Sequence, residues 1–216
     1  MLLTLHLHPL SSFCQKVLVA LYENRTPFTP NIVDLGDAAQ RDALLALWPI
    51  GKFPMLIDAA HSETIAESTI IIEYLAIHHP GTTQLVPADA DLALATRLRD
   101  RFFDLYVDLP MQTIVGDRRR PADARDPFGV EEARQRLRTA YRMIEKDMAT
   151  RTWATGDAFS MADCAAAPAL YYANLVEPFA GNANVARYFD RLRARPSFAR
   201  AVREADPYRH LFPKET

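Results

Sequence analysis

Two hydroxyl groups and a thiol stand close together in the segment HPLSSFCQKV, residues 8–17, where a strand-like pattern gives way to a helical one. Ser11, Ser12 and Cys14 are therefore the first candidates for chemistry. A thiol must ionise to act as a nucleophile, and an unperturbed thiol has a pKa of about 8.5. A serine at a helix start can instead cap the helix, or donate to a thiolate. A hydrogen bond to a charge is worth about 1.5–3 kcal/mol, enough to lower a thiol pKa by about 1–2.

The two cysteines of the chain, Cys14 and Cys164, are too few for a disulfide framework. Free cysteine is among the most buried residue types, so the simplest interpretation of Cys14 is a small core residue in the first turn of a helix. The alternative is a redox thiol whose pKa is lowered near the helix N-terminus. Cys164 lies in an alanine-rich stretch and is expected in the core.

Histidines and arginines offer weaker candidates. His6 and His8 stand two residues apart and so share one strand face, a spacing that can suit a metal ion. The sequence offers no recognisable third ligand, so we expect ordinary hydrogen-bonded histidines and no metal site. The arginines at 118–120 either favour anionic substrates or belong to a solvated surface.

The composition is that of an ordinary soluble globular protein, with 216 residues, 49% hydrophobic and 24% charged, and a net charge of −2. A net charge so close to zero gives no sign of the positively charged surface that binds nucleic acid or an anionic membrane. Residues 1–10 have neither a basic segment nor an apolar block, and no run approaches the ~18 apolar residues of a membrane span. We therefore expect a cytoplasmic protein with reduced thiols.

The first 80 residues alternate between strand and helix patterns. Leucines alternate with polar residues over 2–8, which predicts a strand, and apolar residues recur at helical spacing over 12–24. A second strand is expected over 26–35, where two prolines restrict it to a sheet edge or to its first residues. A short helix, two short strands and a longer helix are expected over 38–47, 53–58, 62–67 and 67–78. The predicted order is β-α-β-α-β-β-α.

The rest of the chain has helical patterns alone. Ser160 and Asp163 have the spacing of a capping box at one helix start. The stretch 80–88, with two prolines and a glycine, is the best candidate for a linker. We therefore predict an α/β domain over 1–79, this linker, and an all-α helical bundle domain over 89–216. Its helices are expected over 89–115, 130–149, 161–176, 183–193 and 197–205.

Three motifs in this order resemble those of the cytosolic glutathione S-transferases. GKFP precedes the third predicted strand, AES precedes the last helix of the first domain, and GDAFSMADC opens a helix of the second. RLRARPSFARAV is similar to the C-terminal helix pair of that family. The resemblance covers nearly the whole chain. It implies a thioredoxin-like N-terminal domain that binds glutathione and a helical C-terminal domain that holds an electrophilic substrate.

The resemblance also implies a glutathione site. A cis bond between Phe53 and Pro54 would turn the backbone groups of Phe53 toward the cysteinyl backbone of glutathione, for strand-like pairing. Lys52 would reach the glycyl carboxylate, or else be a solvated loop lysine. Glu67 and Ser68 would hold the γ-glutamyl ammonium and carboxylate at a helix start. The alternative for these two residues is plain helix capping.

Within this resemblance, Ser11 takes the position at which family members carry their catalytic serine or cysteine. Ser12 is one residue late, and Cys14 takes the position of the second cysteine of redox relatives. Ser11 is therefore expected to donate to the thiolate of bound glutathione, and its alternative is an N-cap without a catalytic part. The nucleophile would be the thiol of glutathione.

A homodimer and a pocket for the electrophile are also implied. The helix over 89–115 is expected to face a second copy of the chain, with Asp100 or Asp104 reaching the glutathione of that copy. Arginines 97, 99 and 101 lie on the same helix and are alternatively a solvated face. The side chains expected in the electrophile pocket, whose alternative is a buried apolar stripe, are Leu10, Phe103, Tyr106, Val107 and Met111.

We predict a glutathione transferase that activates the thiol of bound glutathione for attack on an electrophilic carbon. Three alternatives stay open. The first is a glutathione-dependent isomerase or dehalogenase, the second a thiol reductase acting through Cys14, and the third a non-catalytic interaction protein of the same fold. We expect no nucleic-acid or membrane partner, and the sequence does not identify the electrophile.

Overall fold

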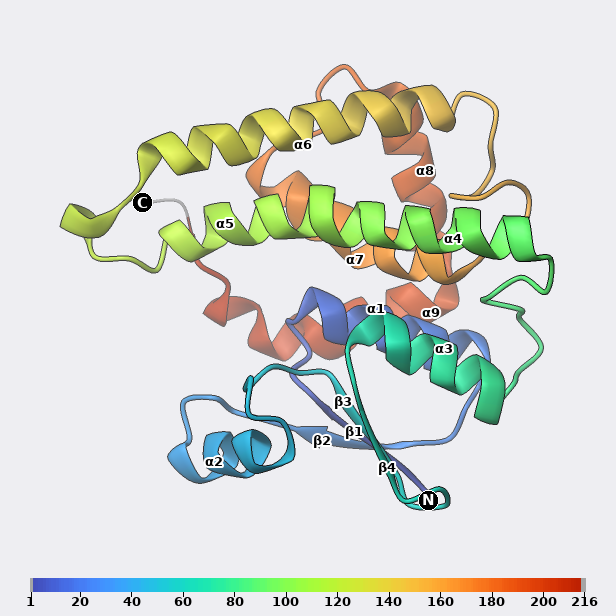
Figure 1. Ribbon diagram of the computed structural model, residues 1–216. Helices are drawn as coiled ribbons and strands as arrows, with labels where there is room; N and C mark the ends of the chain where they lie inside the picture. The colour runs from blue at the N-terminus through green and yellow to red at the C-terminus, as the bar shows by residue number, and fades with distance from the viewer. Residues whose placement is uncertain (1, 215–216) are drawn as a thin grey trace.

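A four-stranded mixed sheet forms the N-terminal domain of the computed structural model, which describes residues 2–214 (Figure 1). The strand order is β2-β1-β3-β4; β1 is parallel to β2, and β3 is antiparallel to both β1 and β4. The predicted β-α-β-α-β-β-α order is confirmed. Its elements are β1 (Leu3–Leu7), α1 (Ser12–Glu23), β2 (Thr29–Ile32), α2 (Ala38–Leu47), β3 (Met55–Asp58), β4 (Glu63–Ala66) and α3 (Ser68–His78).

The sheet follows from the residue pattern. Leu3, Leu5 and Leu7 of β1 are buried, and the polar residues between them are half-buried. β2 lies at the edge of the sheet, as its prolines predict, because Pro30 has no N–H to donate to a second neighbouring strand. α1 and α3 lie between the sheet and the helices of the second domain, whereas α2 lies away from those helices (Figure 1).

The C-terminal domain is helical, as predicted. Among the helices of residues 2–214, none is long and apolar enough to cross a membrane. Helix α7 runs through the middle of the domain and is buried on nearly all sides, as expected of a helix that is apolar all round. The main helices are α4 (Ala90–Phe102), α5 (Leu109–Asp117), α6 (Pro127–Asp147), α7 (Met161–Val176), α8 (Ala183–Ala194) and α9 (Pro196–Ala205).

The structure differs from the prediction in the first of these helices. The sequence predicts one regular helix over 89–115, but the segment Phe103–Asp108 between α4 and α5 is a π-helix. Pro110 accounts for the irregularity, since it cannot donate the hydrogen bond that a regular helix requires at this position. A short 3₁₀ helix, Ala122–Ala124, also lies between the helices predicted over 89–115 and 130–149.

The capping box at the start of α7 is confirmed, and it does more than cap. One carboxylate oxygen of Asp163 accepts from the backbone N–H and hydroxyl of Ser160, at 2.9 and 3.0 Å. The other accepts from the N–H of Ala154 at 2.8 Å and from the hydroxyl of Tyr188 at 2.7 Å. Asp163 is fully buried. It therefore joins the start of α7 to the preceding loop and to α8.

We expect Asp163→Ala to lower the free energy of unfolding by about 3 kcal/mol or more, because it leaves several buried donors without an acceptor. Urea unfolding followed by circular dichroism measures the change. Asp157→Ala, at an exposed position of the preceding loop, is the matched control and should change stability by less than about 0.5 kcal/mol. Equal effects of the two substitutions would contradict the anchoring role of Asp163.

Candidate functional site

Two adjoining cavities lie between the N-terminal domain and the helices α4 and α5. The first has a volume of about 240 Å³ and is lined by all five residues expected at the glutathione site, together with Arg101 and Asp104. The second, of about 610 Å³, is lined by Leu10, Ser11 and Met111. Phe53 lines both cavities. The residues expected at the first cavity are Lys52, Phe53, Pro54, Glu67 and Ser68.

The loop before β3 forms one wall of the first cavity. The bond between Phe53 and Pro54 is cis, as expected. Gly51 has a φ of 66°, a left-handed conformation that glycine adopts without the steric cost of a side chain. A Cβ at this position would also lie 2.9 Å from a methyl group of Leu45 in α2. Both the conformation and the packing therefore favour glycine at the turn that leads to Lys52.

The start of α3 forms the opposite wall. Glu67 is the N-cap residue of α3 and has a φ of 68°, a strained conformation that costs about 1–3 kcal/mol for a residue other than glycine. Ser68 is the first residue of the helix and is buried. The N-terminus of a helix attracts anions, whereas the carboxylate of Glu67 attracts cations. This wall of the cavity can therefore bind a group that carries both charges.

Ser11 is the N-cap of α1, at the end of the second cavity that lies next to Phe53. Its hydroxyl oxygen accepts from the backbone N–H of Cys14 at 3.3 Å. Since the oxygen is the acceptor in this bond, the hydroxyl hydrogen can be donated to a group in the cavity. Ser11 is also half-buried, so a bound ligand can reach it.

The hydroxyl of Ser12, by contrast, is used inside the protein. Ser12 is buried and donates to a carboxylate oxygen of Asp108 at 3.0 Å. The side chain of Gln112 donates to the same oxygen at 2.6 Å, and the other oxygen of Asp108 is buried without a hydrogen bond. Burial raises the pKa of Asp108 to about 7, although the bonds from Ser12 and Gln112 act in the opposite direction.

Cys14 is fully buried beneath Ser11. Burial raises the pKa of its thiol to about 12, although hydrogen bonds with the Ser11 side chain and the His8 backbone act to lower it. Cys14 is therefore a neutral thiol at physiological pH, and the structure favours the core interpretation over the redox one. Cys164 is buried too, as expected, and burial also raises its pKa.

A buried lysine beneath the first cavity was not identified from the sequence. The Nζ atom of Lys16 lies 2.7 Å from a carboxylate oxygen of Asp100 and 2.8 Å from one of Asp104. Lys16 also donates to the hydroxyl of Thr69 at 2.9 Å, and Thr69 in turn donates to Asp100 at 2.6 Å. A lysine on the apolar face of α1, together with acids four residues apart at 100, 104 and 108, is the signal that could have predicted this network.

The arginines of α4 form ion pairs within the chain. The sequence alone did not show whether they face a second copy or solvent. Arg97 binds Glu73 of α3 at 2.8 Å, Arg99 binds Asp147 at the end of α6 at 2.6 Å, and Arg101 binds Asp104 at 3.1 Å.

Three of the five side chains expected in the electrophile pocket lie away from Ser11. Phe103 and Val107 are buried in the hydrophobic core, and Tyr106 lines a separate apolar pocket beside α6. The reason is the helical phase. The acids of α4 and of the π-helical segment face α1, so the aromatic and aliphatic residues beside them face the core or solvent. The structure brings Leu10 and Met111 to the cavity of Ser11, but not these three residues.

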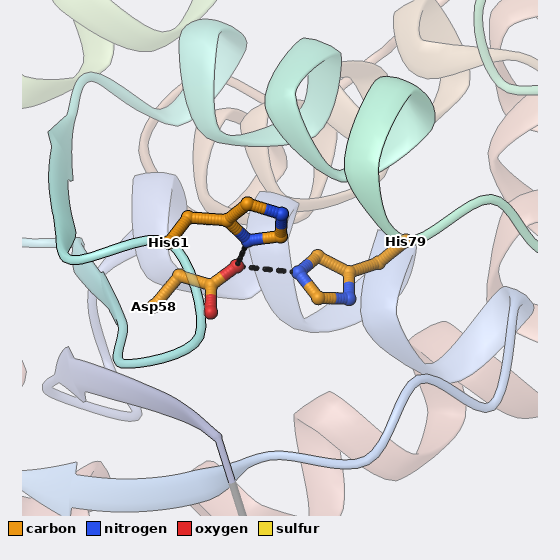
Figure 2. Close-up of side chains that lie close together, drawn as sticks. All are labelled: Asp58, His61 and His79. Carbon is orange, nitrogen blue, oxygen red and sulfur yellow. Dashed lines mark hydrogen bonds and ion pairs between the residues drawn. The ribbon is translucent and has the colours of Figure 1, made fainter.

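His6 and His8 are hydrogen-bonded, as expected. A ring nitrogen of His6 lies 2.8 Å from the side-chain nitrogen of Asn31, and His8 accepts from the N–H of Leu10 at 3.2 Å. A different pair of histidines, which sequence reasoning missed, converges on a single carboxylate (Figure 2).

The chain is similar to known proteins along most of its length. The model described as glutathione S-transferase, N-terminal domain, matches residues 5–83, and the one described as glutathione S-transferase, C-terminal domain, matches residues 127–191. Glutathione S-transferase 3 of Zea mays is 31% identical over 208 residues, which cover 90% of each chain. FtsZ-localized protein A of Caulobacter vibrioides is 29% identical over 205 residues, covering 90% of this chain and 88% of that protein.

Solved structures have the same fold. A crystal structure of a glutathione S-transferase from Methylobacillus flagellatus with GSH bound superposes with a TM-score of 0.85 at 27% identity. It covers 92% of this chain and 98% of that one.

We expect Asp108→Asn to stabilise the protein at pH 8. With a pKa of about 7 when folded and about 3.9 when unfolded, this carboxyl loses roughly 4 kcal/mol of stability as the pH rises from 4 to 7, because only the unfolded chain releases the proton in that window. The gain from Asp108→Asn should therefore be largest at pH 8 and vanish near pH 4.

Urea unfolding at a series of pH values tests this. The exposed Asp123→Asn is the matched control and should leave the pH dependence of stability unchanged. A gain for Asp108→Asn that is the same at pH 4.5 and pH 8 would show that Asp108 is ionised throughout.

Proposed function

Since the chain belongs to the glutathione S-transferase family, we propose that it is a glutathione transferase in which Ser11 holds the thiol of bound glutathione as a thiolate. The thiolate then attacks an electrophilic carbon. The observation that carries this proposal is the position of Ser11 at the N-terminus of α1. From there its hydroxyl hydrogen can be donated to a ligand held between the loop at Phe53 and the start of α3.

The first cavity suits the three charged or polar parts of glutathione. The γ-glutamyl carboxylate binds at Ser68 and the N-terminus of α3, and its ammonium group binds Glu67. The backbone of Phe53 pairs with the cysteinyl backbone, and Lys52 binds the glycyl carboxylate. This orientation directs the cysteinyl side chain to the boundary with the second cavity, which Phe53 shares. The bound tripeptide in the Methylobacillus relative supports the choice of ligand.

The thiol is activated by stabilising its ionised form. The Ser11 hydroxyl donates a hydrogen bond to the thiolate, and the N-terminus of α1 adds a favourable potential. The bond from Ser11 lowers the thiol pKa by about 1–2, and the helix N-terminus acts in the same direction, so the proton leaves to solvent near neutral pH. The sulfur then forms a bond to the electrophilic carbon, and the leaving group departs with its electron pair. The second cavity holds the electrophile against Leu10 and Met111.

The alternatives within the fold differ in the reaction that the thiolate undergoes. A glutathione-dependent isomerase or dehalogenase shares the activation by Ser11 and differs in the second substrate. A thiol reductase would need Cys14 as a nucleophile, and the burial and raised pKa of that thiol argue against it.

A role in protein interaction is the second candidate function, because one relative is named for its localisation with FtsZ. Such a protein would lack turnover with every electrophile of a broad panel, whereas the transferase turns over at least one.

We also propose a homodimer. Leu94 and Leu98, one turn apart on α4, are each 66% exposed, and a second copy of the chain would cover them.

Ser11→Ala should leave glutathione binding intact and raise the pKa of the bound thiol by about 1–2, with a fall in turnover at neutral pH of about 10- to 100-fold. Titration of the ultraviolet absorbance of the thiolate measures the pKa, and retention on immobilised glutathione measures binding. The exposed Ser62→Ala is the matched control. An unchanged thiol pKa in the Ser11→Ala protein would contradict the proposed role of Ser11.

Cys14→Ala should retain turnover within about twofold, because the buried neutral thiol takes no part in the reaction. Intact mass measured after incubation with glutathione disulfide should reveal no adduct on Cys14. Cys164→Ala removes the other buried thiol and serves as the control for loss of packing. A mixed disulfide at Cys14, or activity lost in Cys14→Ala but kept in Cys164→Ala, would favour the reductase.

A further inference from the structure

Three side chains from separate segments meet at the end of the sheet farthest from Ser11. Asp58 is the last residue of β3, His61 lies in the turn between β3 and β4, and His79 is the C-cap of α3. Figure 2 shows both imidazole rings directed at the carboxylate of Asp58. We propose that Asp58, His61 and His79 form a binding site for a divalent transition-metal ion such as Zn²⁺.

The spacing of the three donor atoms suits chelation. The Nδ1 atom of His61 lies 2.8 Å and the Nε2 atom of His79 lies 2.6 Å from the same oxygen of Asp58. The candidate ligand atoms all lie within 4.8 Å of one another. Zinc binds histidine nitrogen and carboxylate oxygen at about 2.0–2.2 Å in a tetrahedral arrangement, so two of its ligand atoms stand about 3.4 Å apart. A small outward movement of the rings is sufficient to admit the ion.

The donor set has the composition of a transition-metal site. Two imidazoles and one carboxylate are ligands of zinc and of other first-row divalent ions, and three protein ligands leave a further position for water. Each imidazole now directs a nitrogen at the carboxylate, where it can hold a proton. A metal ion needs a lone pair from the nitrogen that faces it, so a proton held there passes to the other ring nitrogen or to solvent when the ion binds.

A second set of contacts holds the carboxylate in place. The hydroxyl of Tyr74 donates to the same oxygen of Asp58 at 3.0 Å, and the N–H of Ala60 donates to the other oxygen at 2.9 Å. Supporting contacts of this kind are typical around metal ligands.

The two histidines of the cluster reach solvent, whereas the aspartate does not. The side chain of Asp58 is fully buried, whereas that of His61 is 44% exposed and that of His79 is 22% exposed. An ion can therefore enter past the ring of His61 and meet a carboxylate that water does not solvate. A charge shielded from water attracts a cation more strongly than an exposed carboxylate does.

This site is separate from the glutathione site. Asp58 pairs with Leu3 at the start of β1, whereas Ser11 follows the end of that strand. Helix α3 has Ser68 at its first residue and His79 just beyond its last, which at 1.5 Å per residue places their backbones about 16 Å apart. The proposed ion therefore takes no part in activating the thiol.

Calorimetric titration of the full-length, chelator-treated protein with Zn²⁺ tests the proposal. We expect one equivalent to bind with a micromolar or tighter dissociation constant and to raise the melting temperature. His61→Gln should weaken binding by at least about 100-fold, and Tyr74→Phe, which removes only a supporting contact, by about 10-fold. His210→Gln, an exposed histidine near the C-terminus, is the matched control and should bind like the wild type.

The Co²⁺-loaded protein supplies a second readout, since the visible absorption of bound Co²⁺ reports its ligands. The spectrum should be lost in His61→Gln and kept in His210→Gln, while circular dichroism verifies that both proteins are folded. Zinc binding that is unaffected by His61→Gln, or that requires millimolar concentrations in the wild type, would overturn the assignment. Because His61 lies on the surface turn, this variant keeps the test valid even if His79→Gln fails to fold.

Discussion

The buried ammonium group of Lys16 is the interaction on which the arrangement of the site depends. A charge removed from water is tolerated only when it is paired and hydrogen-bonded, and breaking such a pair costs about 3–5 kcal/mol. Lys16 is 1% exposed and is held by Asp100, Asp104 and Thr69. These partners come from α4, the π-helical segment and α3, so a single cation joins both domains.

This ion pair lies directly behind the proposed glutathione site. Thr69 follows Ser68 at the start of α3, and Asp104 lines the first cavity. Lys16 itself is in the helix that Ser11 caps. The residues proposed to bind the γ-glutamyl group and the residue proposed to bind the sulfur are therefore carried by helices that the same cation holds together. Catalytic geometry of this kind requires rigid support, because small displacements of a donor weaken its effect.

Local patterns in the sequence predicted local structure well. The structure has α2 and α7 with the residue bounds that the sequence predicts, and the capping box of Ser160 and Asp163 was found from its spacing alone. The residues around the first cavity followed from the resemblance, which supplied long-range information that periodicity lacks. The features that escaped prediction depend on pairing between distant segments.

Lys16, Asp108 and the cluster at Asp58 illustrate this limit. Lys16 lies on a helix that was predicted correctly, whereas Asp108 lies in the π-helical segment that was not, and in each case the burial and the partners are set by how the elements pack. Sequence spacing placed Phe103, Val107 and Met111 on one stripe, and all three are buried in the core, but of these three Met111 alone also lines the cavity of Ser11. Periodicity cannot reveal the π-helical segment that precedes the proline at 110.

Helix α3 is fixed at both ends, which limits how its length can vary. Its first turn is joined to Lys16 through Thr69, and its C-cap is joined to β3 through His79 and Asp58. One inserted residue would rotate one end by about 100° relative to the other and shift it by about 1.5 Å, so both attachments could not form together. The helix thus sets a fixed spacing within the domain. Variation in chain length is better accommodated in the loop after this helix.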